Sequence, residues 1–167
     1  MKSNDMKTNK LDLSCYAIDP SKGRKYEDIT YVLALIYNAL QAKVSYYLSK
    51  YDLSVVQFNM LVLIAYYNKG KGLNQVDISK HLIASASNIT KLVEKSVKAN
   101  LLTRKTNPQS RRENIICITK KGQELIDEIW PGYDDLVRRL TEKIPAKNRL
   151  QIEQTLKSWL FDLQQEK

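Results

Sequence analysis

The sequence predicts a mainly α-helical protein with one small β-hairpin, an α+β fold class. Apolar residues recur at every third or fourth position over long stretches, as they do along the buried face of a helix. Residues 101–119 contain two short runs rich in β-branched residues around a polar turn, which is typical of a hairpin. With 167 residues, 43% of them hydrophobic, the chain can bury the core of one domain or of a close pair of subdomains.

The chain is expected to begin with an irregular arm and a long helix. Residues 1–25 are polar and end in the turn-prone DPSKGRK, so they form the arm. A long helix over residues 26–52 follows, because its apolar positions step by threes and fours. These positions are Ile29, Leu33, Ile36, Leu40, Val44, Tyr47 and Tyr51.

A second helix is expected to lie at the centre of the core. Ser54 can cap it, and it runs over residues 55–69 with apolar side chains nearly all round. The glycines of GKG at residues 70–72 suit a cap at its C-terminal end.

The stretch IASASNITKLVEK, residues 83–95, contains the second helix of a helix-turn-helix pattern. Asn74 caps a short helix over residues 75–82, and a tight turn leads to the second helix, which Ser85 caps. The first turn of that helix is small: Ala86, Ser87 and Asn88. A small first turn lets the helix axis approach base edges of DNA, and the helix N-terminus offers N–H groups to a phosphate. The alternative is that the small residues only cap the helix.

This helix divides into an inner and an outer face. The buried stripe is expected to be Ile89, Leu92, Val93 and Val97, while Ser87, Asn88, Lys91 and Lys95 face outward. The amide of Asn88 can make paired hydrogen bonds to adenine. Thr90 contacts a thymine methyl group or a phosphate if it is turned outward.

A basic hairpin directly after the helix-turn-helix is a wing. Its strands are predicted at residues 101–106 and 113–119, with the polar tip NPQS followed by Arg111 and Arg112. Guanidinium groups are drawn to narrow, A·T-rich minor grooves. Arg104, in the first strand, is also predicted to bind DNA.

The distribution of charge favours a polyanion partner. The net charge of the chain is +9, and residues 69–122 contain twelve Lys or Arg against three Asp or Glu. A catalytic triad or a zinc site is not expected, since the chain has one histidine, His81, and two cysteines. The sequence therefore predicts no enzyme, no cofactor and no metal site. It shows neither a signal peptide nor an apolar run of the ~20 residues that a membrane span needs, so a cytoplasmic protein is expected.

In this order and spacing, the motifs resemble the multiple antibiotic resistance regulator (MarR) family of winged-helix transcription factors. The resemblance covers residues 53–129 and includes LSVVQFNML, LNQVDISKHL, ITKLVEKSVKANLL and RKTNPQSRRENIICITKKGQEL. It implies a homodimer, with the helix after Ser85 in the major groove of an operator and the wing arginines in the minor groove. It also implies that residues 53–122 form the DNA-binding domain. The helix at 26–52 and two helices within 123–167, at about 120–143 and 146–165, would form the dimer interface.

Three positions depart from the family pattern. Ser110 stands where the wing usually carries an aspartate, so it cannot form the usual ion pair. Asn100 replaces the glycine that ends the recognition helix, and asparagine also tolerates a left-handed backbone. Ser96 replaces a leucine in the middle of that helix, where Val97 takes over some of the packing.

The means of regulation is open from the sequence. The resemblance implies a small phenolic or carboxylate effector, and seven of the ten tyrosines lie between positions 31 and 67. We expect effector contacts from Tyr37, Tyr47, Tyr66 and Tyr67, although each is also a reasonable core or interface residue. The alternatives are a redox response through Cys15 or Cys117 and a winged helix used only for protein–protein contact.

Overall fold

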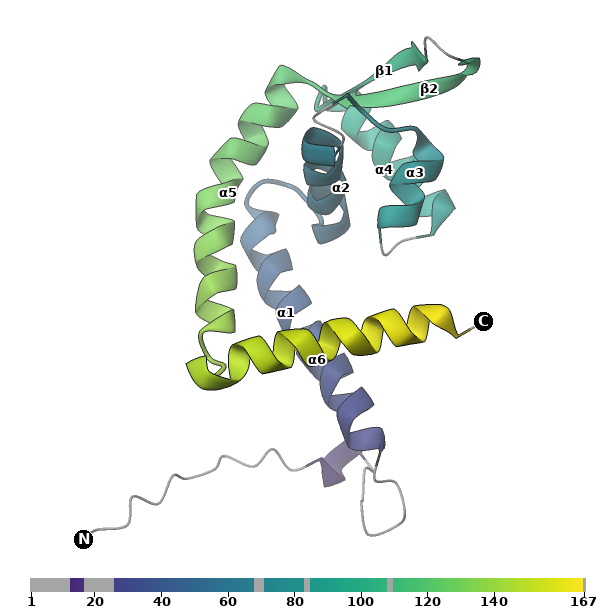
Figure 1. Ribbon diagram of the computed structural model, residues 1–167. Coiled ribbons are helices and arrows are strands. Elements are labelled where there is room, and N and C mark those ends of the chain that lie inside the picture. Colours follow the sequence, from purple (N-terminus) through teal and green to yellow (C-terminus); the bar gives the residue numbers. More distant parts are fainter. Residues whose placement is uncertain (1–12, 17–25, 68–70, 83–84, 108–109, 167) are drawn as a thin grey trace, which may run out of the picture. The chain divides into compact units, whose positions relative to one another are not determined.

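Figure 1 shows the computed structural model, which describes residues 13–16, 26–67, 71–82, 85–107 and 110–166. The described part contains six α-helices, one two-stranded antiparallel sheet and a short 3-10 helix, η1 (Ser14–Tyr16). The mainly α fold with a single hairpin is therefore confirmed. The chain divides into two compact units, Met1–Ala42 and Lys43–Lys167.

The described part of the first unit consists of η1 and most of helix α1 (Glu27–Ser49). The ring of Tyr16 in η1 lies 5.3 Å from the ring of Tyr31 in α1. Acidic residues in the first turn of α1 complement the positive end of the helix dipole. The predicted apolar stripe is present here, but Ile29, Ile36 and Leu40 are exposed.

The core of the second unit is built around α2 (Val55–Tyr66). In Figure 1, α2 lies between α5 (Lys120–Thr141) on one side and α3 (Gln75–His81) and α4 (Ala86–Lys98) on the other. Because α2 is apolar nearly all round, it can contribute side chains to both sides. The fully buried members of this core include Phe58, Met60, Leu61, Ile64, Ile78, Ile89, Val93, Leu102, Ile116, Ile126 and Ile129.

Side-chain caps define where these helices begin. Ser54, Asn74 and Ser85 each accept a hydrogen bond from the backbone N–H three residues on, at 3.2, 2.8 and 3.4 Å, as the sequence predicts. Thr119 caps α5 in the same way, at 3.0 Å. Asn100 has a φ of 60°, which confirms the left-handed backbone expected after α4.

The prediction that glycines cap α2 is wrong. The helix ends at Tyr66, and the capping residue Tyr67 has an extended backbone, with its N–H bonded to the carbonyl of Leu63. Gly72 instead serves the turn before α3, where its φ is +86°. A Cβ at this position would lie 2.6 Å from the Cys117 sulfur, so the turn needs glycine in order to approach the sheet.

The wing is the antiparallel pair of β1 (Leu102–Asn107) and β2 (Ser110–Ile118). The strands reach closer to the tip than expected, because Asn107 pairs with Ser110 rather than belonging to the turn. The rest of the predicted tip, residues 108–109, lies outside the described residues. The register passes directly from Thr106–Asn114 to Asn107–Ser110, so residues 111–113 form an irregularity in β2. At the base of the wing, Leu73 adds a bridge to Ile116.

Two long helices follow the wing: α5 and α6 (Ala146–Gln165). One face of α5 is buried through Gly122, Ile126 and Ile129, while α6 has no buried residue. The guanidinium of Arg149 donates hydrogen bonds to the carbonyls of Glu142 and Ile144, which satisfies backbone groups at the corner between the helices. A membrane-spanning segment would need a longer apolar run than any described helix contains.

Candidate nucleic-acid interface

Helix α4, the expected recognition helix, is amphipathic, and one of its faces is buried in the core. Ile89 and Val93 are fully buried, and Leu92 and Val97 are partly buried against the core, which confirms the predicted stripe. Ser96 is also fully buried, so the core face includes the position where the sequence departs from the family.

The outer face of α4 carries the predicted DNA-binding residues. Ser87, Asn88, Lys91 and Lys95 are all exposed, as is the capping residue Ser85. The hydroxyls of Ser85 and Ser87 lie 3.3 Å apart. Ala86 occupies the first helical position, but its side chain lies outside the described residues. The outer face therefore combines short polar side chains near the helix N-terminus with lysines one and two turns further on.

Thr90 is not on this outer face. It is half-buried, and its hydroxyl accepts a hydrogen bond from the side-chain amide of Gln75 in α3. The outward orientation that a direct base contact requires is thus not the one observed. Gln75 is a residue that the sequence reasoning missed. The signal available in the sequence was its place directly after Asn74, the cap of α3.

Lys95 makes a long ion pair on the surface. Its ammonium lies 3.9 Å from the carboxylate of Asp52, and both side chains are largely exposed. Exposed pairs of this kind contribute about 0–1 kcal/mol. Lys95 can therefore exchange this partner for a phosphate at little energetic cost.

Of the three arginines of the wing, the structure describes the side chain of one. Arg104 is exposed on β1, opposite Ile116. Arg111 and Arg112 belong to β2 at its irregular section, but their side chains lie outside the described residues. A bulge turns successive side chains away from strict alternation, which is a common device for directing a side chain at a functional site.

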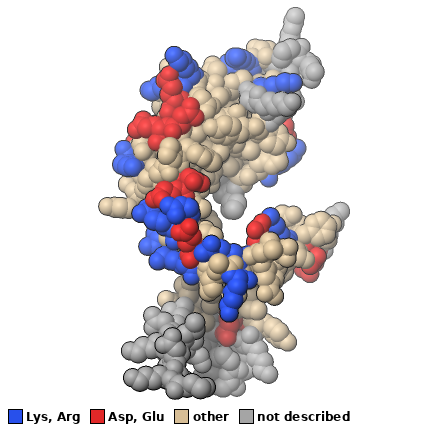
Figure 2. Space-filling view, turned by 60° about the vertical axis from the view of Figure 1, so that its left-hand side comes forward, with Lys and Arg blue, Asp and Glu red and all other residues tan. Residues whose placement is uncertain are grey.

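Basic and acidic residues are mixed elsewhere on the second unit. Along α5, Lys120 pairs with Glu124, and Arg138 and Arg139 both pair with Asp135. Figure 2 shows Lys or Arg side chains next to Asp or Glu side chains on the face it presents. A surface of mixed sign is typical of a solvated face. The outer face of α4 differs in having two exposed lysines, Lys91 and Lys95, against one exposed acidic residue, Glu94.

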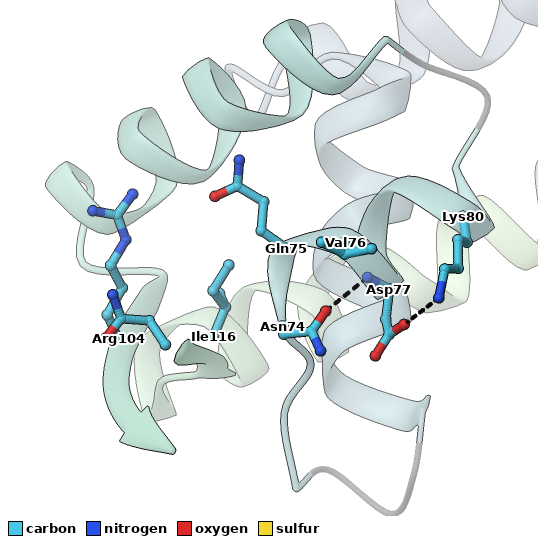
Figure 3. A pocket seen from close by; sticks show the side chains of 8 residues that line it. Asn74, Gln75, Val76, Asp77, Lys80, Arg104 and Ile116 are labelled. Carbon is cyan, nitrogen blue, oxygen red and sulfur yellow. Dashed lines mark hydrogen bonds and ion pairs between the residues drawn. The ribbon is translucent and has the colours of Figure 1, made fainter. Parts of the chain in front are cut away.

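A pocket of about 470 Å³ lies between the start of α3 and the wing (Figure 3). It is lined by Asn74, Gln75, Val76, Asp77, Lys80, Arg104, Asn114 and Ile116. Asp77 is engaged by Lys80 at 3.0 Å. The pocket thus contains one of the predicted DNA-binding arginines beside polar side chains from α3.

The four tyrosines expected to contact an effector lie in different surroundings. Tyr37 belongs to the first unit, where its hydroxyl accepts a hydrogen bond of 3.0 Å from Gln41. Tyr66 packs its ring 6.3 Å from Trp130, and Tyr67 lies 4.9 Å from the ring of His81. Burial, with a smaller contribution from Tyr51, raises the pKa of Tyr47 to about 12. The pocket of Figure 3 is lined by none of the four, so their role toward an effector stays a prediction.

The two cysteines also differ. Cys15 is exposed in η1, whereas Cys117 is buried in β2, with its thiol 3.8 Å from the carbonyl of Lys71. A buried thiol is poorly accessible to oxidants in solution. Among the described residues, no group of His, Cys, Asp and Glu side chains is arranged to hold a metal ion.

Comparisons with known proteins agree with this geometry. Residues 42–129 match the family model described as transcriptional regulator SarA/Rot. Over 116 residues the chain is 33% identical to the HTH-type transcriptional regulator MhqR of Bacillus subtilis (strain 168), covering 67% of this chain and 78% of MhqR.

Solved structures share the fold. The chain matches AbsC, a MarR family transcriptional regulator from Streptomyces coelicolor, with a TM-score of 0.76 and 18% identity over 84% of this chain and 95% of AbsC. It matches the S. aureus MepR–DNA complex with a TM-score of 0.72 and 21% identity, over 80% of this chain and 96% of MepR. The family consists of transcriptional regulators rather than enzymes. The chain belongs to the winged-helix transcriptional regulators of the MarR and SarA/Rot type.

Proposed function

We propose that the chain represses transcription as a homodimer that binds a pseudo-palindromic operator in duplex DNA. The observation that carries this proposal is the division of α4 into a buried face at Ile89 and Val93 and an exposed face at Asn88, Lys91 and Lys95. A helix held in the core by one face can present the other to the major groove. The similar fold of MepR, solved in complex with DNA, supports this reading. Since the operator would lie in the cytoplasm, we expect the protein to act there.

The outer face of α4 has the chemistry that a major groove requires. The amide of Asn88 can make paired hydrogen bonds to an adenine, and such a contact discriminates bases by about 1–3 kcal/mol. Lys91 and Lys95 supply charge for phosphates, which position the protein without reading sequence. The small residues Ser85 and Ala86 let the helix approach closely, and its N-terminal dipole favours a phosphate.

The wing is proposed to enter the adjacent minor groove. Arg111 and Arg112 lie in the irregular section of β2, next to the tip of the hairpin, and Arg104 lies on the opposite strand. Guanidinium groups are drawn to the negative potential of narrow minor grooves. This contact would depend on the shape of the groove rather than on single bases.

A homodimer is proposed because large apolar side chains are exposed on the terminal helices. On α6 these are Leu150, Ile152, Leu156, Leu160, Phe161 and Leu163, and on α1 they are Ile29, Ile36 and Leu40. Monomeric proteins rarely expose many large apolar groups along one helix, and a second copy is a common means of covering them. The residues at 26–52 and 123–167 would then serve dimerisation, and residues 53–122 would serve DNA binding.

A small carboxylate or phenolic effector is proposed to release the protein from DNA. The specific observation is that Arg104 lines the pocket of Figure 3 and also belongs to the proposed DNA surface. A carboxylate bound in the pocket would compete with a phosphate for this guanidinium. Lys80, already paired with Asp77 in the pocket, offers a second cation.

The test is a salt-dependent titration of a labelled, random-sequence duplex, followed by fluorescence anisotropy. The affinity should fall linearly on a log–log plot against salt, with a slope of about −0.9 for each phosphate neutralised. Replacing Lys91 and Lys95 by alanine removes two proposed phosphate contacts. The slope should therefore become less steep by about 2.

The matched control is Lys157→Ala, which removes an exposed lysine from α6 and should leave the slope unchanged. Binding that is absent, or that does not depend on salt, would favour a winged helix that contacts another protein instead.

A further inference from the structure

The contact between α2 and the recognition helix contains a buried polar pair. Gln57 of α2 is 2% exposed and Ser96 of α4 is 0% exposed, and they are the two buried polar residues in the described part of the chain. The side-chain amide of Gln57 donates a hydrogen bond of 3.2 Å to the hydroxyl of Ser96. The other buried residues of the core are hydrophobic.

This pair is not the most stable solution for a core. The carbonyl oxygen of the Gln57 side chain is buried, and it has no hydrogen-bond partner among the described residues. A buried acceptor without a partner loses its hydration and gains nothing in return. An apolar pair of similar volume would avoid that loss, so stability alone does not explain the presence of Gln57 and Ser96.

Ser96 stands where three elements meet. Its side chain is bonded to α2, and its backbone carbonyl accepts the N–H of Leu101 at 2.9 Å, immediately before β1. On the other side of the pair, the backbone N–H of Gln57 is bonded to the cap residue Ser54 at 3.2 Å. Both ends of the Gln57–Ser96 bond are therefore fixed to rigid backbone.

The bond lies on the opposite face of α4 from the residues that would touch DNA. Ser96 follows Ile89 and Val93 at helical spacing on the core face, while Asn88 and Lys91 are exposed. Apolar contacts are non-directional and allow α4 to rotate slightly about its axis, whereas a hydrogen bond has a preferred direction. A small rotation would turn Asn88 away from a base edge.

We propose that Gln57 and Ser96 are positioning residues, whose hydrogen bond fixes the rotation of the recognition helix on α2 and so directs Asn88 at base edges in the major groove. This role rests on the proposed DNA binding. The pair selects one orientation of α4 and gives up some stability to do so. Polar groups in cores are known to specify one arrangement among several of similar energy.

The test compares stability with sequence preference in the full-length protein. The double variant Gln57→Met with Ser96→Ala replaces the polar pair by apolar side chains, and Ser96→Ala alone removes only the hydroxyl. A duplex selected by the wild type from a random pool serves as the preferred probe, with an unselected duplex as reference.

The double variant should melt at the same temperature as the wild type or higher. Its preference for the selected duplex should nevertheless fall by about tenfold, as when one good base contact is lost. Its affinity for the unselected duplex should stay the same. The preference of Ser96→Ala for the selected duplex should fall by a similar factor. This single variant still tests the proposal if the double variant does not fold.

A matched control separates positioning from packing. Val93→Ala truncates an apolar side chain on the same face of α4, so it should lower the melting temperature and leave the preference unchanged. The proposal is overturned if the variants with an altered polar pair keep the wild-type preference, or if Val93→Ala loses as much. If the wild type binds no duplex at all, the proposed DNA binding fails first, which is a distinct result.

Discussion

The hydroxyl of Tyr47 donates a hydrogen bond of 2.8 Å to the carbonyl of Ile129, which ties the C-terminal end of α1 to the middle of α5. This approach favours a glycine at position 132, because a Cβ there would collide with the Tyr47 oxygen. Pro131, just before that glycine, has no N–H to give to the helix. The bond therefore joins α1 to α5 close to Pro131 and Gly132, two poor helix formers within α5.

Tyr47→Phe should lower the free energy of unfolding by about 1 kcal/mol, because it removes one neutral hydrogen bond and little packing. The measurement is urea denaturation followed by circular dichroism. The control is Tyr46→Phe, which alters the exposed neighbouring residue and should change stability by less than about 0.5 kcal/mol. Equal losses in the two variants would contradict the role given to the bond.

Gly132→Ala should destabilise the wild type, since its methyl group would collide with the Tyr47 hydroxyl. In the Tyr47→Phe background the shortest of these contacts is gone, although the ring carbons Cζ and Cε2 would still lie 3.0 and 3.1 Å from the new methyl group. The same change should then destabilise the protein less than it destabilises the wild type. A double-mutant cycle measures this coupling. Additive effects of the two substitutions would mean that they do not meet in the folded protein.

The stability of the protein should fall at alkaline pH through Tyr47. Its pKa is raised from 10.0 to about 12 in the folded state, so the folded protein holds this proton more tightly than the unfolded chain does. The resulting stabilisation is fully present below pH 10 and is lost as the pH rises toward 12. The unfolding free energy of the wild type, relative to Tyr47→Phe, should decline over this window. If the difference in unfolding free energy between the wild type and Tyr47→Phe stays constant with pH, the raised pKa of Tyr47 is contradicted.

Local features of the fold could be predicted because they depend on neighbours in the sequence. The caps Ser54, Asn74 and Ser85 each satisfy a backbone donor three residues away, and the left-handed Asn100 follows from the chemistry of a helix end. The end of α2 was not predicted: the helix stops at Tyr66, and the ring of its capping residue Tyr67 lies 4.9 Å from that of His81, a contact that no local pattern indicates.

Contacts between segments that are distant in the sequence could not be predicted from the periodic patterns. Periodicity placed Ile29, Ile36 and Leu40 on one apolar face of α1, yet all three are exposed, while Leu48, outside that pattern, is buried. A helical period identifies an apolar face but not what covers it.

In the candidate site, the outward residues of α4 followed from its period. Thr90 did not, because its partner Gln75 lies on another helix.

Leu156→Glu should disrupt the proposed homodimer. The residue is exposed on α6, so a charge there is tolerated in a monomer but not in a buried apolar interface. Sedimentation velocity should show the wild type as a dimer and the variant shifted toward a monomer. Gln154→Glu, which places the same charge at another exposed position of α6, should stay dimeric. A wild type that sediments as a monomer would remove the proposal.

The central claim, that α4 lies in the major groove and the wing in the minor groove, is tested most directly by competition titrations of Asn88→Ala and Arg112→Ala. Each variant is measured on a duplex selected by the wild type and on an unselected duplex. Asn88→Ala should lose about 1–3 kcal/mol on the selected duplex and little on the other, because a base contact specifies sequence. If both duplexes carry A·T-rich flanks, Arg112→Ala should weaken binding to both of them. The reason is that the arginine side chain responds to the shape of the minor groove rather than to single bases. If Asn88→Ala weakens both duplexes equally while Arg112→Ala leaves both unchanged, the assignment of helix and wing to their grooves is wrong.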